Sequence, residues 1–289
     1  GRMSNGFWRP VVFVVARCLW LVCGYAPLGF HVICWVLHAT AALLTCSVAV
    51  RLGMTRRTAV LACLMFATHL GAWPAVSRYA TVCELFLACF SLACIIAWQR
   101  WLDSGNRRWL AWCAILMLLA LGSKETAVVL PIALGIITWE QGRRPWDLVL
   151  VGFLGVIAAA FTASALLGQS SGGSYLSMGY IHVSAKSLLR QFLDYWASVA
   201  CPYLHIMEPT IAVAKPSQAF LWTVRAGILA TISAIFLVGG LRAPTLLRKS
   251  RLLMVLASIF MLPGVILNRG PPLGRFVYPA LPFACILLA

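Results

Sequence analysis

Long apolar runs recur along nearly the whole chain and are separated by short polar segments. Several have about 17 to 25 residues, enough for a helix to cross a hydrocarbon core of about 30 Å. Because lipid offers the backbone no hydrogen-bond partners, such runs are stable in a membrane as helices. The pattern predicts an all-α fold, a polytopic transmembrane helix bundle that forms a single domain over residues 1–289. The predicted crossings are 31–50, 58–70, 81–98, 109–121, 127–139, 148–167, 219–240 and 252–267, of which 58–70 and 127–139 are short.

Two further segments have a pattern unlike that of a simple crossing. Residues 11–24 carry Arg17 near their middle, which favours an interfacial or half-inserted helix. Residues 187–203 form an amphipathic pattern that is typical of a helix lying in the membrane surface. Its apolar stripe contains Leu188, Leu189, Phe192, Tyr195, Trp196 and Val199, and Arg190, Gln191, Asp194 and Ser198 lie opposite.

The composition excludes an ordinary soluble protein. Hydrophobic residues make up 62% of the chain and charged residues 10%, with a mean hydropathy of +0.91. In soluble proteins, by contrast, about a quarter of the residues are charged. A formal net charge of +16 could indicate nucleic-acid binding, but the lysines and arginines are spread over short loops. We therefore expect no nucleic-acid partner, and contacts with membrane lipid instead.

The distribution of positive charge predicts the orientation of the helices. Short cytoplasmic loops are enriched in Lys and Arg, so the four basic clusters are placed inside. These clusters are 51–57, 99–109, 140–147 and 241–251. The segments 69–79, 122–125, 168–217 and 268–275 then form the outer loops.

The cysteines and the chain ends add two expectations. Most of the eleven cysteines lie inside apolar runs without metal-type spacing, so we interpret them as small core hydrophobes and expect no metal site. The sequence starts at Gly1 without a signal peptide and stops at Ala289 within an apolar run. We expect a fragment that lacks the first helix and most of the first outer loop, and a C-terminal part could be missing as well.

Charged and polar side chains collect in the predicted outer loops. Lys124 and Glu125 begin an inward helix, where free N–H groups and the positive end of the helix dipole face outward. A lysine at such a position makes a site suited to phosphate. The alternative is a helix cap with a snorkelling lysine. The complete outer set is Arg9, His69, Arg78, Lys124, Glu125, Asp194, Glu208, Arg269 and Arg275.

Other polar residues have a structural interpretation beside the functional one. Arg78 and Arg275 could be interfacial anchors. His38 lies within a predicted crossing and is expected to be a neutral core histidine with one hydrogen bond. Glu84 lies a turn or two into its helix, and since an unpaired carboxylate in lipid is costly, it is expected to face the bundle interior.

Several motifs resemble the GT-C superfamily of membrane glycosyltransferases over nearly the whole chain, from Phe7 to Phe283. The similarity is greatest to the group of protein O-mannosyltransferases, aminoarabinose transferases and tetratricopeptide-linked mannosyltransferases. The most specific pieces are "SKE…P" at 123–131 and "RFVYP" at 275–279. In chain order the motifs are "FWRP", "GFH", "LHATAALL", "RLG", "LMFATH", "SRYA", "RRWLAW", "LGSKETAVVLP" and "GRFVYPALPF".

The resemblance implies an active site at the extracytoplasmic face and a sugar on a polyprenyl phosphate as donor. It implies a catalytic carboxylate upstream of Phe7, outside this chain. Lys124, Arg275 and Arg78 match the positions expected near the donor phosphate. Further polar groups that could belong to the site are Arg9, His69, Glu84, Glu125 and Tyr278. Two positions depart from the pattern: Ala80 replaces an aspartate and Leu70 replaces a proline, and Glu84 is only a loose substitute for the missing acid.

The implied reaction is an inverting displacement. A carboxylate removes the proton of an acceptor hydroxyl, which attacks the anomeric carbon while the lipid phosphate leaves. Cationic side chains stabilise the charge on that phosphate, without a cofactor. The partners expected are membrane lipid, the lipid-linked donor and an acceptor that the sequence leaves open, in a bacterial inner membrane. Two other functions stay open: a transporter or flippase, and a non-catalytic membrane protein of the same fold.

Overall fold

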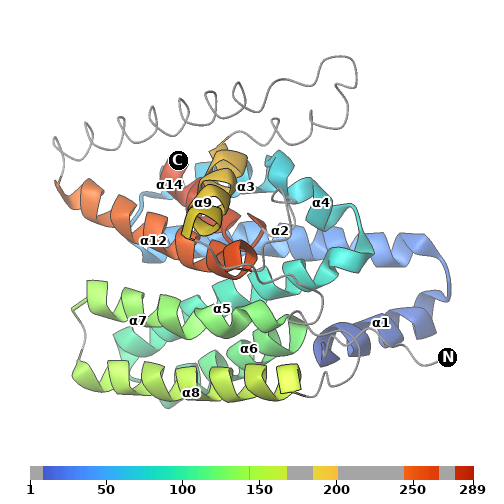
Figure 1. Cartoon of the computed structure of the whole chain (residues 1–289), viewed down its shortest axis with the longest axis horizontal. Coiled ribbons are helices and arrows are strands. Elements are labelled where there is room, and N and C mark those ends of the chain that lie inside the picture. Colours follow the sequence, from blue (N-terminus) through green and yellow to red (C-terminus); the bar gives the residue numbers. More distant parts are fainter. Residues whose placement is uncertain (1–8, 143, 168–184, 201–243, 267–276) are drawn as a thin grey trace.

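The computed structural model describes residues 9–142, 144–167, 185–200, 244–266 and 277–289. Every regular element among these residues is a helix (Figure 1), in agreement with the predicted all-α bundle. The elements are α1 (Pro10–Cys23), α2 (Pro27–Arg51), α3 (Arg56–Thr68), η1 (Leu70–Ala72), α4 (Trp73–Val76), η2 (Tyr79–Thr81), α5 (Val82–Ser104), α6 (Arg107–Ser123), η3 (Glu125–Val129), α7 (Leu130–Glu140), α8 (Pro145–Leu167), α9 (Ala185–Ala200), α12 (Pro244–Ile266) and α14 (Leu281–Leu288), where η marks a 3-10 turn.

Four helices in the described part of the chain are long and apolar enough to cross a membrane: α2, α5 with η2, α8 and α12. Helix α3 and the segment Leu70–Val76 make a fifth if they count as one span, bent there by 50°. Helices α6 and α7 have 17 and 11 residues, at or below the lower limit for a straight crossing. The predicted crossings 109–121 and 127–139 are therefore helical but short, and 219–240 lies outside the described residues.

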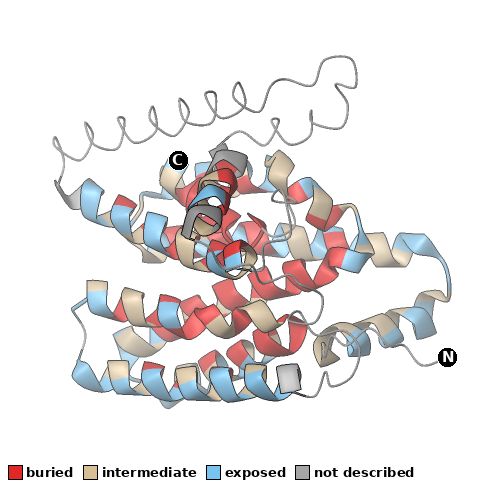
Figure 2. Ribbon diagram, in the orientation of Figure 1, coloured by how far each residue is buried: buried red, intermediate tan, exposed pale blue. Residues whose placement is uncertain are grey.

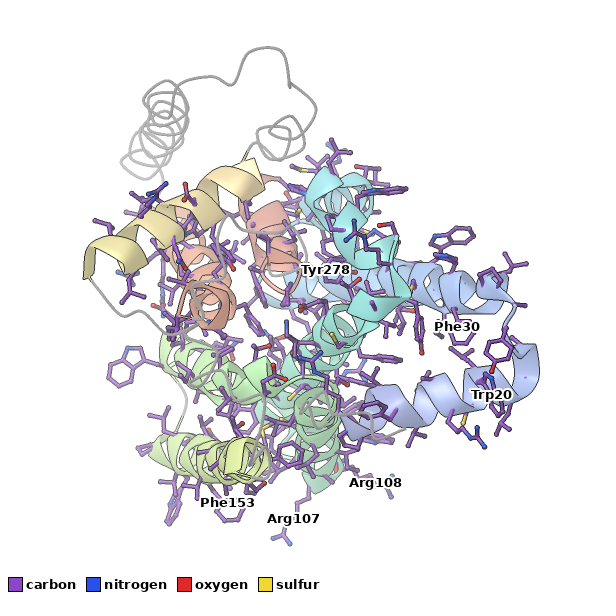
Figure 3. All side chains as sticks on the ribbon, turned by 45° about the vertical axis from the view of Figure 1, so that its right-hand side comes forward. Trp20, Phe30, Arg107, Arg108, Phe153 and Tyr278 are labelled. Atoms are coloured by element: carbon purple, nitrogen blue, oxygen red, sulfur yellow. The ribbon has the colours of Figure 1, made fainter. Side chains whose placement is uncertain are left out.

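Helix α5 forms the centre of the bundle and contacts α2, α6 and α7. Its interior contains neither glycine nor proline, and it ends at Gly105, whose φ of 65° is a left-handed conformation that favours glycine. The fully buried Trp98 on α5 donates from Nε1 to Thr138 Oγ1 on α7 at 2.9 Å. By contrast, much of α8 is exposed (Figure 2), and Phe153 on it points away from the bundle (Figure 3).

The four predicted basic clusters meet at one end of the bundle, here called the basic end. Polar contacts join the end of α2 to the end of α5. Others join the start of α12 to the end of α7 and to the loop after α2. This arrangement agrees with the prediction that the clusters share one side, while the identity of that side stays a prediction. The contacts are Arg51–Asp103 at 3.6 Å, Arg248–Glu140 at 2.8 Å, Arg251–Glu140 at 3.2 Å and a hydrogen bond from Lys249 Nζ to the Gly53 carbonyl oxygen.

Helix α9 confirms the predicted helix over residues 187–200 and buries most of its apolar stripe, with Tyr195 and Val199 each 3% exposed. Gln191 and Asp194, assigned to the polar stripe, are 7% exposed, whereas Leu189 of the apolar stripe is 60% exposed. The reason is packing on α12. Tyr195 reaches so close to Gly264 that a Cβ there would lie 2.3 Å from Tyr195 Oη. Contact with a neighbouring helix therefore covers part of the polar stripe of α9 as well, which the sequence pattern did not predict.

The cysteines in the described part of the chain carry free thiols. Those that point into the helix interfaces include Cys34, Cys89, Cys94, Cys113 and Cys285, all buried. This agrees with their interpretation as small core hydrophobes. Cys94 on α5 and Cys113 on α6 bring their Sγ atoms to 3.4 Å, which marks the close packing of these two helices.

Candidate functional site

Lys124 connects the last residue of α6 to the first residue of η3, at the opposite end of α6 from the basic clusters. Its backbone is extended, with φ −159° and ψ 135°, so it interrupts the helical backbone between α6 and η3. The side chain turns inward and its Nζ donates to Oε1 of Glu84, in the first turn of α5. The Lys124 and Glu84 side chains are 5% and 2% exposed. The prediction that Glu84 faces the bundle interior is confirmed.

Arg9 and Glu125 form a second ion pair beside the first. Arg9 Nη2 lies 3.1 Å and Nε 3.3 Å from the two carboxylate oxygens of Glu125, a two-point contact of the kind that arginine makes best. Arg9 Nη1 also lies 3.4 Å from Cys83 Sγ. The start of α1 packs closely on α6, because a Cβ at Gly122 would lie 3.0 Å from Val11 Cγ2.

The two ion pairs form one polar cluster because their members are neighbours in sequence. Glu84 follows Cys83, which contacts Arg9, and Glu125 follows Lys124. Two cations and two carboxylates balance within the cluster, whereas the sequence analysis assigned Lys124 to a donor phosphate and did not predict its pairing with Glu84. Glu84 Oε2 is buried and has no hydrogen-bond partner. This oxygen is therefore a position in the cluster to which a bound molecule could donate a hydrogen bond.

The Arg9 and Lys124 charges oppose the effect of burial on Glu125. Burial raises the pKa of this carboxyl group, but the positive charges of Arg9 and Lys124 and the hydrogen bonds to the carboxylate outweigh it. The pKa of Glu125 is therefore below its usual value of 4.5. A carboxyl group whose pKa is lower in the folded state stabilises the fold above its ordinary pKa, and this contribution is lost as the pH falls through the lowered value.

The Glu125 pair predicts an acid-sensitive contribution to stability. As the pH falls below 4.5, the thermal unfolding midpoint of the protein is expected to fall more steeply than that of a Glu125→Gln variant. Asp103→Asn is the matched control, because the Asp103 side chain is 57% exposed and such pairs contribute little. Equal pH slopes for the protein and the Glu125→Gln variant would contradict the prediction.

The remaining predicted site residues have other surroundings. Arg78 is exposed at the start of η2. His69 accepts a hydrogen bond on Nδ1 from the Gly71 N–H at 3.0 Å, so its Nε2 donates to the Val199 carbonyl oxygen, also at 3.0 Å. These bonds give His69 a structural role that ties α3 to α9. Asp194 lies 4.0 Å from Arg190 on its own helix; Glu208, Arg269 and Arg275 lie outside the described residues.

Tyr278 is fully buried and belongs to a polar contact inside the bundle. Its side chain lies among α2, α3 and α14 (Figure 3), and its Oη lies 2.8 Å from His38 Nδ1. His38 Nε2 lies 3.1 Å from the Ala67 carbonyl oxygen, so Nε2 donates there and Nδ1 accepts from Tyr278. His38 makes two hydrogen bonds where one was predicted, since Tyr278 approaches from a distant part of the sequence.

Among the residues that the structure describes, no group of three or more His, Cys, Asp and Glu side chains could hold a metal ion. The four residues of the polar cluster, Arg9, Glu84, Lys124 and Glu125, were all predicted from the sequence as site residues, but their pairing was not. A usable signal was present, because charges in a bundle this apolar are expected to pair. Glu84 and Glu125 lie in or near the predicted outer loops together with Arg9 and Lys124, and this equal number of carboxylates and cations would have indicated the pairing.

Parts of two proteins from Drosophila melanogaster are similar to this chain. It is 35% identical over 132 residues to Protein O-mannosyl-transferase Tmtc2, a match that covers 43% of this chain and 14% of that protein. The match to Protein O-mannosyl-transferase Tmtc1 is 30% identical over 160 residues and covers 54% of this chain and 18% of that protein. No family model and no solved structure matches. Over about half of its length, this chain is therefore related to proteins of the group that its motifs resemble.

Proposed function

We propose that this protein is a membrane glycosyltransferase that moves a sugar from a polyprenyl-phosphate carrier to a hydroxyl acceptor at the extracytoplasmic face. The observation that carries the proposal is the buried Glu84–Lys124 pair, flanked by Arg9–Glu125, at the end of the bundle away from the basic clusters. Burying ionisable groups in a membrane bundle is costly and is a mark of functional sites. The similarity to protein O-mannosyl-transferases supports mannose as the sugar and a protein as the acceptor.

Lys124 and Glu84 would act as a pair that the donor opens. The lipid phosphate competes with the Glu84 carboxylate for the Lys124 ammonium, and it is a strong acceptor for that group. Glu84, once released, accepts the proton of the acceptor hydroxyl. The hydroxyl oxygen then bonds to the anomeric carbon, and the carbon–oxygen bond to phosphate breaks with its electrons remaining on the phosphate. The resemblance implies a base upstream of Phe7, and Glu84 is the candidate that the described residues offer.

Arg78 and Arg275 would supply the positive charge that the balanced cluster lacks. Arg78 is exposed and available to a lipid headgroup, and Arg275 retains the role that the "RFVYP" motif implies. Cations aimed at the leaving phosphate stabilise the charge that develops there. The proposal requires a membrane but not a bacterial one. Because the relatives come from an insect, the bacterial inner membrane stays a prediction.

Sugar transfer in vesicles tests the proposed function. The purified protein, reconstituted with radiolabelled mannosyl-phosphoryl polyprenol, is expected to transfer label to serine- and threonine-containing peptides or to water. Glu84→Gln is expected to lower the rate by about 100-fold or more, because it removes a proton acceptor. Asp103→Asn, at the basic end, is the control and should leave the rate unchanged.

Three results would count against parts of this proposal. Full activity of Glu84→Gln would remove Glu84 from the reaction and leave the rest intact. Movement of labelled donor between leaflets without release of sugar would favour the flippase alternative. Donor binding with neither movement nor transfer would favour the non-catalytic alternative.

A further inference from the structure

A groove of about 700 Å³ runs along α12 at the basic end and lies against α9. This volume is within the range of small-molecule sites, which have about 300–1,000 Å³. Its walls are mostly apolar, with Met254, Val255 and Leu262 on α12 and Phe192 on α9. Arg248 and Arg251 line the end of the groove nearest the start of α12, here called its mouth. An apolar groove with two guanidinium groups at one end matches a lipid that has an apolar chain and an anionic headgroup.

The two arginines keep positive charge available at the mouth. Both bind the same carboxylate, Glu140, at 2.8 and 3.2 Å, so one negative charge faces two positive ones. Their side chains are 61% and 68% exposed. Since each guanidinium has five N–H donors in a planar fork, donors remain for a second anion. Arginine is well suited to phosphate, which it can contact at two points.

We infer that this groove binds an anionic phospholipid of the leaflet at the basic end, with one acyl chain along α12 and the phosphate on Arg248 and Arg251. Charge complementarity selects this occupant, because a zwitterionic lipid adds a positive group beside two arginines. Basic pockets between membrane helices commonly bind such headgroups. The site lies at the opposite end of the bundle from the Glu84–Lys124 pair and does not depend on the proposed function.

Lipid titration followed by native mass spectrometry tests the site. The delipidated protein in detergent is expected to retain phosphatidylglycerol over phosphatidylcholine of the same chain length by about tenfold or more. Arg251→Gln should reduce this preference to near unity. Glu140 keeps Arg248 as a partner in that variant, so its carboxylate is not left unpaired. Val255→Trp, at a position 37% exposed on the groove wall, should reduce retention of both lipids by filling the groove.

Arg108→Gln is the matched control. Arg108 lies at the start of α6, in the same group of basic clusters, and points away from the bundle (Figure 3). It should keep the full lipid preference, with an unchanged unfolding midpoint. Met254→Trp replaces Val255→Trp if the latter lowers the midpoint. Equal retention of the two lipids by the protein, or an equal loss in Arg108→Gln and Arg251→Gln, would overturn the inference. Uptake of neither lipid would also overturn it and would favour a polypeptide occupant.

Discussion

Replacing Lys124 with alanine is expected to lower the free energy of unfolding by about 3–5 kcal/mol. The Glu84 carboxylate would keep its burial, at 2% exposure, but lose the ammonium that compensates its charge. Removing one member of a buried ion pair costs this much because the other charge stays desolvated and uncompensated. Chemical or thermal unfolding in a fixed detergent, compared with the unaltered protein, measures the loss.

The double variant Glu84→Gln, Lys124→Met separates charge from packing. Replacing both members of a buried pair with groups of similar volume is often close to neutral, so the double variant should recover most of the stability. A stable Lys124→Ala protein, or a double variant as unstable as the single one, would contradict the buried pair. The comparison also affects binding studies, because weaker donor binding by Lys124→Ala alone could arise from the unpaired carboxylate.

Replacing Trp98 with alanine is expected to cost a similar amount, about 3–5 kcal/mol. Trp98 is fully buried in α5, and the large cavity would form where α5 packs on α7. Thr138 would also lose the indole N–H that donates to its Oγ1 at 2.9 Å. The unfolding midpoint and the slope of a denaturant titration measure the effect.

Trp112 provides the matched control for that substitution. It is the same residue type on α6 but is 54% exposed, so Trp112→Ala creates no internal cavity. We expect less than about 1 kcal/mol for this variant, in the range usual for surface substitutions. If both tryptophan variants lost equal stability, the effect would come from contact with the surrounding detergent or lipid and not from packing at the centre of the bundle.

The long apolar runs predicted the helices well, because the helix is the stable backbone conformation for such a run in a membrane. The predicted crossings 31–50 and 148–167 lie within α2 and α8, and the segment 11–24 differs from α1 by one residue at each end. Burial of Glu84 also followed from a local argument about the cost of a charge in lipid. Such features depend on the residue and its immediate neighbours, which the sequence displays directly.

The features that the sequence did not predict all depend on contacts between distant segments. The Lys124–Glu84 pair joins residues 40 positions apart, and the Tyr278–His38 hydrogen bond joins residues 240 apart. The burial of Gln191 and Asp194 accompanies the close approach of Tyr195 on α9 to Gly264 on α12. One sequence, without related sequences to reveal paired changes, contains no direct information about these partners.

The two ends of the bundle handle charge in different ways, and this predicts different responses to ionic strength. Contacts of Arg248 and Arg251 are open to solvent, where dissolved ions screen charges over about 8 Å in physiological salt. Ions have little access to the enclosed Glu84 carboxylate. Concentrated sodium chloride should therefore loosen the tie between α7 and α12 while the junction of α5 with η3 stays closed.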